Sequence, residues 1–78
     1  MKDKVLQLVV TFRNTISAIT MEKICRELDL PGKLIPVPRS ISASCGMAWL
    51  APEDARQILE EAVSDKNLAI EGWYHIMI

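Results

Sequence analysis

The chain has 78 residues, of which 50% are hydrophobic and 24% charged, and its formal net charge is -1. This length fits one domain over residues 1–78, and the composition is that of a folded chain. Nucleic-acid binding is excluded because no basic cluster is present, and no apolar run reaches the roughly 18 residues of a membrane helix. We expect a cytoplasmic domain whose two cysteines are reduced thiols.

The first half of the chain predicts a strand, a helix and a second strand. Residues 4–12 alternate, with Leu8 and Val10 on one face of a strand. Asn14 or Thr15 can cap the helix that follows, and the pair Pro31-Gly32 ends it. Residues 33–37 form a short edge strand, because its prolines cannot donate to a sheet. The apolar stripe of the helix is Ala18, Met21, Ile24, Cys25 and Leu28.

The second half predicts a strand over residues 46–50, a helix and a last strand over residues 69–78. Pro52 stands at the first helical position, with Glu53 and Asp54 in the first turn. Gly72 marks a bulge in the last strand. The order βαββαβ predicts an α+β fold, a ferredoxin-like sandwich in which two helices cover one face of a four-stranded antiparallel sheet. The buried stripe of the second helix is Ala55, Ile58, Leu59, Ala62 and Val63.

The other face of this sheet has no helix to cover it. Val5 and Val9 would lie on that face, joined by one or both of Trp49 and Trp73. An open apolar face on so small a domain is a candidate homodimer surface. The alternative is that these are single surface apolar residues, which are common.

The segment of residues 38–46 reads PRSISASCG and places Cys45 in a polar loop. In the predicted topology this loop lies at the end of the sheet where the first strand leads into the first helix. Cations and helix N-termini promote ionisation of a thiol, so we expect Cys45 to be exposed, partly ionised and nucleophilic. A passive thiol in an ordinary loop is the alternative. The supporting groups are Arg13 and Arg39 as cations, Ser42 and Ser44 as donors, and Gly46, which allows close approach.

The remaining reactive residue types have structural explanations. Cys25 belongs to a helical stripe and is expected to be a small buried hydrophobe. The two cysteines and the single His75 have no metal-ligand spacing, so we expect no metal and no other cofactor. Because no second catalytic group is visible, we expect a carrier or binding protein and not an independent enzyme.

Four segments together resemble a family of small bacterial domains of unknown function, the selenium/sulfur carrier protein-like family. They are KLIPVPR at 33–39, SASCG at 42–46, PED at 52–54 and EGWY at 71–74. The resemblance covers nearly the whole chain, although Trp49 and Ala51 depart from the family pattern.

The resemblance implies that Cys45 accepts sulfur or selenium as a persulfide or selenosulfide. A donor of the cysteine desulfurase type would supply the atom, and an acceptor protein would receive it. Two alternatives remain open: a non-catalytic dimerising or regulatory module, and a redox sensor in which Cys45 is oxidised.

Overall fold

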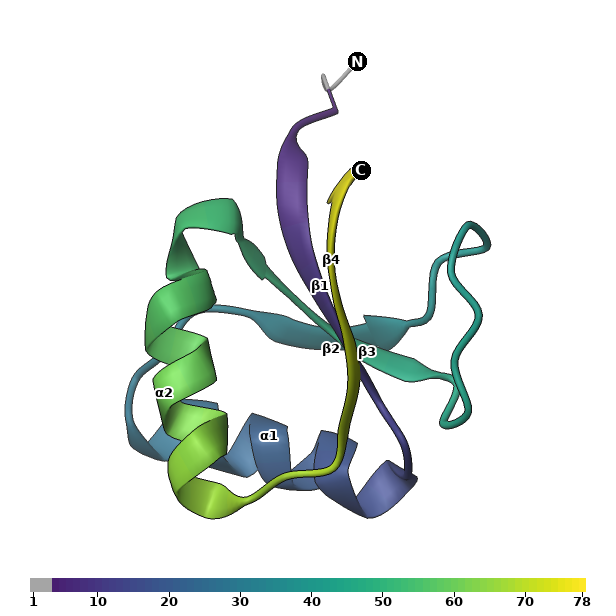
Figure 1. Ribbon diagram of the computed structural model, residues 1–78. Coiled ribbons are helices and arrows are strands. Elements are labelled where there is room, and N and C mark those ends of the chain that lie inside the picture. The colour runs from purple at the N-terminus through teal and green to yellow at the C-terminus, as the bar shows by residue number, and fades with distance from the viewer. Residues whose placement is uncertain (1–3) are drawn as a thin grey trace.

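The computed structural model describes residues 4–78 (Figure 1). Its elements in chain order are β1 (Leu6–Phe12), α1 (Thr15–Glu27), β2 (Lys33–Pro36), β3 (Met47–Pro52), the 3-10 turn η1 (Glu53–Ala55), α2 (Arg56–Lys66) and β4 (Ile70–Met77). Within the described residues, no helix has the length and apolar character needed to cross a bilayer.

The four strands form one sheet in the order β2-β3-β1-β4, and every neighbouring pair is antiparallel. Both helices lie on the same side of this sheet (Figure 1). The prediction of an α+β fold with a four-stranded antiparallel sheet and two helices is therefore confirmed. β1 is a central strand, which explains why its residues are almost continuously buried.

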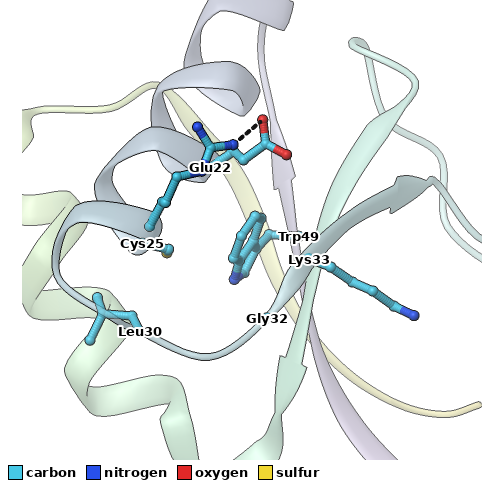
Figure 2. Close-up of a pocket in the computed structure, with 7 residues that line it drawn as sticks. Glu22, Cys25, Leu30, Gly32, Lys33 and Trp49 are labelled. Carbon is cyan, nitrogen blue, oxygen red and sulfur yellow. Dashed lines mark ion pairs between the residues drawn. The ribbon is translucent and has the colours of Figure 1, made fainter.

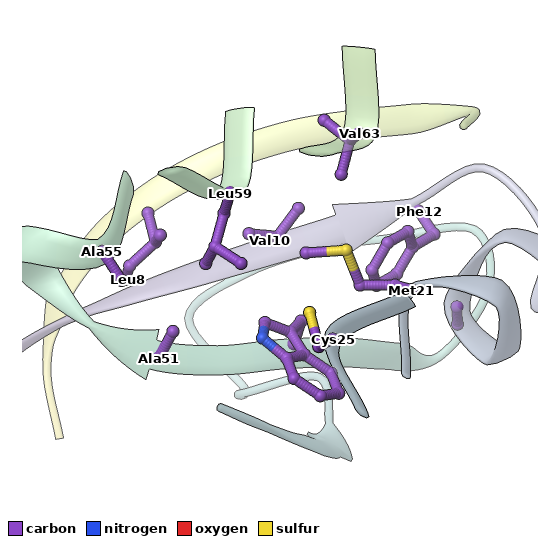
Figure 3. Packing of buried hydrophobic residues seen from close by; sticks show 11 residues of the cluster. Leu8, Val10, Phe12, Met21, Cys25, Ala51, Ala55, Leu59 and Val63 are labelled. Carbon is purple, nitrogen blue, oxygen red and sulfur yellow. The ribbon is translucent and has the colours of Figure 1, made fainter. Parts of the chain in front are cut away.

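The main core lies between the sheet and the two helices (Figure 3). β1 supplies every second residue to it, as the period of a strand requires. Because the large apolar side chains are almost fully buried, each stabilises the fold by about 1.5–3 kcal/mol. The principal members are Leu8, Val10 and Phe12 from β1, Met21 and Cys25 from α1, Trp49 from β3, and Leu59 and Val63 from α2.

The opposite face of the sheet is covered over Val9, which corrects the prediction that Val9 lies on an open face. Val9 has no exposed surface, because Ile41 from the β2–β3 connection folds onto this face and is only 9% exposed. Val5 is exposed, as expected, but it lies beyond the covered area. Trp49 is part of the helix-side core and Trp73 packs against that core, so neither tryptophan lies on the opposite face.

Several expected boundaries and stripe positions also differ. β3 continues to Pro52, which therefore ends a strand, and Glu53 opens the 3-10 turn that precedes α2. Leu28 caps the C-terminus of α1 and is exposed, and Ile58 on α2 is exposed too. The N-cap of α1 is Asn14, whose side-chain oxygen accepts the N–H of Ser17 at 2.8 Å, so this cap is confirmed.

Candidate functional site

Cys45 lies in the connection between β2 and β3, residues 37–46, which extends from the sheet on the side away from α2 (Figure 1). The connection closes where the N–H of Val37 donates to the Gly46 carbonyl at 3.1 Å. It turns where the N–H of Ile41 donates to the Pro38 carbonyl at 3.0 Å. Because Ile41 is buried against the sheet, the connection is anchored at its middle and at its base.

The Cys45 side chain is half-buried at the margin of the main core, and not exposed as expected, because it packs against that core. Its Sγ donates to the Met47 carbonyl, at a distance of 3.7 Å. This bond needs the protonated thiol, so formation of the thiolate breaks it and the sulfur becomes free to turn outward. Gly46 has a φ of 81°, and a Cβ atom added to it would have no other atom within 4 Å. The backbone beside the sulfur is thus open to an approaching partner.

The strand register places Cys45 at the end of the sheet where β1 leads into α1. Ala48 pairs with Thr11, so Cys45, three residues earlier, lies beyond the last paired residues of β1. α1 begins at Thr15, close to the same end. The predicted side of the sheet is therefore the observed one.

The two expected cations lie on the surface and do not contact the sulfur. The Nε of Arg13 donates to the Ile70 carbonyl at 3.4 Å, and Arg39 is exposed. Within residues 4–78, neither arginine forms a hydrogen bond or an ion pair with Cys45. Ser42 and Ser44 are also exposed. The arginines can contribute only to the potential around the site.

Glu71 is a site residue that the sequence does not reveal. In β4, Gly72 pairs with Thr11 and Ile70 pairs with Phe12, so Glu71 is the extra residue of a β-bulge. A bulge redirects a side chain, and here the Glu71 carboxylate accepts the backbone N–H of Ser44 at 3.3 Å. The charged group bound to the Cys45 loop is therefore an anion. In the sequence, the expected bulge at Gly72 is the only indication of an irregularity beside Glu71.

Cys25 is a structural residue, as predicted. It is 1% exposed, and burial raises the pKa of its thiol from 9.0 to about 11. Its tip lies at the floor of a hollow of about 270 Å³ (Figure 2). Trp49 forms one wall, held by the hydrogen bond that its Nε1 donates to the Pro31 carbonyl at 3.2 Å. At neutral pH this thiol stays protonated and unreactive.

His75 lies in a surface network between η1, α2 and β4. Its Nε2 is 2.8 Å from the guanidinium of Arg56, and its Nδ1 is 3.5 Å from the carboxylate of Glu53. Arg56 also pairs with Glu60 at 2.8 Å and lies over the ring of Trp73. Among the residues described, no three potential metal ligands lie together.

One known family matches most of the chain. A sequence profile of the family described as "Putative Se/S carrier protein-like" matches residues 7–75. The chain belongs to this family. No curated protein and no solved structure matches the chain significantly. The matched region runs from β1 into β4 and includes the whole connection that carries Cys45.

Proposed function

We propose that this chain carries sulfur or selenium on Cys45, as a persulfide or selenosulfide, and passes the atom to a partner protein. The observation that carries the proposal is the contrast between the two thiols. Cys25 is 1% exposed, whereas Cys45 is half-buried on a surface connection within the family match. A carrier needs one accessible thiol and no acid-base pair, and Cys45 meets that requirement.

The proposed loading step is a thiol exchange without net oxidation. Cys45 releases its proton to solvent, and its Sγ leaves the Met47 carbonyl. The thiolate then attacks the terminal sulfur of a donor persulfide. A new S–S bond forms on Cys45, the S–S bond of the donor breaks, and the donor departs as a thiolate. A terminal selenium atom follows the same path, and attack by an acceptor thiolate unloads the carrier.

Two cations and one carboxylate, that of Glu71 on the Ser44 N–H, surround the approach to Cys45. Arg13 and Arg39 are exposed cations on the segments that flank this end of the sheet, and such charges raise the local potential for anions. The open backbone at Gly46 leaves room for the donor chain. We also infer a ferredoxin-like topology, supported by β1 and β2 running parallel with β3 between them.

Incubation with a cysteine desulfurase and cysteine, followed by intact-mass measurement without reductant, tests the proposal. Wild type and Cys25→Ala should each gain the mass of one sulfur atom, whereas Cys45→Ser should gain none. Uptake by Cys45→Ser equal to that of wild type contradicts the proposal. Mild peroxide applied to the same variants tests the redox alternative, in which Cys45 gains oxygen or forms a disulfide.

A further inference from the structure

The two edges of the sheet differ in how well they are protected against another strand. The edge strand β2 has four residues, ends at Pro36 and is followed by Pro38. Proline cannot donate a backbone hydrogen bond, so it blocks pairing. The other edge strand, β4, has eight residues and no proline. In the part of the chain that the structure describes, no strand lies beyond β4.

The hydrogen bonds between β1 and β4 identify which groups of β4 face outward. The N–H of Val5 donates to the Ile78 carbonyl at 3.4 Å, and the N–H of Ile78 donates to the Val5 carbonyl at 3.1 Å. Bonded and non-bonded pairs alternate along an antiparallel ladder. The backbone groups of Trp73, His75 and Met77 therefore point away from β1, toward the open edge.

Exposed apolar side chains occur on both faces of the sheet where β4 ends. Leu6 pairs with Met77, and these residues are 40% and 54% exposed. Val5 and Ile78, the adjoining pair, are 54% and 38% exposed. Side chains alternate between the two faces of a strand, so Leu6 and Met77 lie on the helix side of the sheet and Val5 and Ile78 on the opposite side. The edge thus combines outward backbone groups with one exposed apolar side chain of β4, Met77.

We propose that β4 pairs in antiparallel fashion with β4 of a second copy of this chain, about a two-fold axis at His75. The outward residues Trp73, His75 and Met77 are two positions apart, so a register centred on His75 pairs the backbone groups of all three. His75 lies opposite His75 of the second copy, and Trp73 lies opposite Met77 at both ends. Sulfur–aromatic contacts are favourable, and each exposed Met77 covers the other copy's half-buried Trp73. Such an isologous interface closes as a dimer.

Charge and the bulge are both compatible with this register. The paired segment, residues 73–77, stops before Glu71, whose carboxylate stays on the Cys45 loop. Near the axis, Arg56 is paired with Glu60 at 2.8 Å, and His75 lies 3.5 Å from Glu53. Each copy therefore brings one guanidinium and two carboxylates to the axis, and these side chains are partly exposed, so solvent screens the excess negative charge. The interface does not include Cys45, so the proposed dimer does not depend on the carrier function.

Sedimentation velocity over a range from about 5 µM to about 500 µM tests the dimer. His75→Pro removes the outward N–H of residue 75 and leaves the bonds to β1 intact, because that N–H faces away from β1. His75→Ala is the matched control, since it loses the same imidazole contacts but keeps the N–H. Wild type and His75→Ala should dimerise, and His75→Pro should dimerise about thirtyfold more weakly, for two lost hydrogen bonds.

Hydrogen exchange on the wild type gives a second measurement that needs no substitution. The N–H groups of Trp73, His75 and Met77 should be exchanged quickly in dilute protein and become protected as the concentration rises. Those of Tyr74 and Ile76, which face β1, should stay protected throughout. A wild-type monomer at the highest concentration, equal dimerisation of the two variants, or concentration-independent exchange overturns the proposal.

Discussion

Removal of the Glu71 carboxylate should loosen the loop that holds Cys45. The hydrogen bond from the Ser44 N–H to this carboxylate is 3.3 Å long and lies at the surface. A bond of this kind contributes about 0.5–1 kcal/mol net, so its loss should increase local opening of the loop about two- to fivefold. Because Cys45 is half-buried in the closed loop, its alkylation rate should rise by the same factor.

Two variants separate the hydrogen bond from the charge. Glu71→Gln and Glu71→Ala both lose the negative charge, but glutamine keeps an oxygen that can accept the Ser44 N–H. The alkylation rate of Cys45, measured at a fixed pH with an excess of iodoacetamide, should therefore be higher in Glu71→Ala than in Glu71→Gln. Exchange of the Ser44 amide should accelerate in parallel. Equal alkylation rates in the two variants would refute the idea that this contact orders the loop.

Two further predictions concern stability, measured by urea unfolding. Burial raises the pKa of Cys25 from 9.0 to about 11, so this thiol ionises at lower pH in the unfolded chain than in the folded one. The free energy of unfolding of wild type should therefore fall by up to about 3 kcal/mol between pH 9 and 11, and that of Cys25→Ala should not show this fall. Identical pH dependence of the two proteins would contradict this. Gly32→Ala should cost about 3 kcal/mol or more, since φ is 127° and the new Cβ meets the indole of Trp49. Gly46→Ala, with φ at 81° and open space, should cost about 1 kcal/mol, and equal costs would rule out the clash.

The parts of the fold that depend on local pattern were predictable from the sequence. The period of two identifies β1 and places Leu8, Val10 and Phe12 on one face, and the Asn14 cap follows from its side-chain chemistry. The polar segment around Cys45 marks a surface thiol because no apolar period passes through it. The position of Cys25 in the apolar stripe of a helix identifies a buried thiol.

The contacts that depend on tertiary register were not predictable. Ile41 is one apolar residue in a polar loop, and no periodicity tells which face it will cover, so Val9 was expected on an open face. Glu71 reaches Ser44 only because a bulge turns it there, and a bulge arises from the pairing of β1 with β4. Both residues are far in sequence from the groups that they contact.

We propose that Cys45, and not Cys25, holds the transferred atom. Wild-type protein loaded by a cysteine desulfurase, trapped by alkylation and digested after lysine, tests it within one molecule. The cleavages at Lys23, Lys33 and Lys66 place the cysteines in separate peptides, 24–33 and 34–66. The added sulfur should lie in peptide 34–66 alone. Sulfur in peptide 24–33, or in neither peptide, would contradict it.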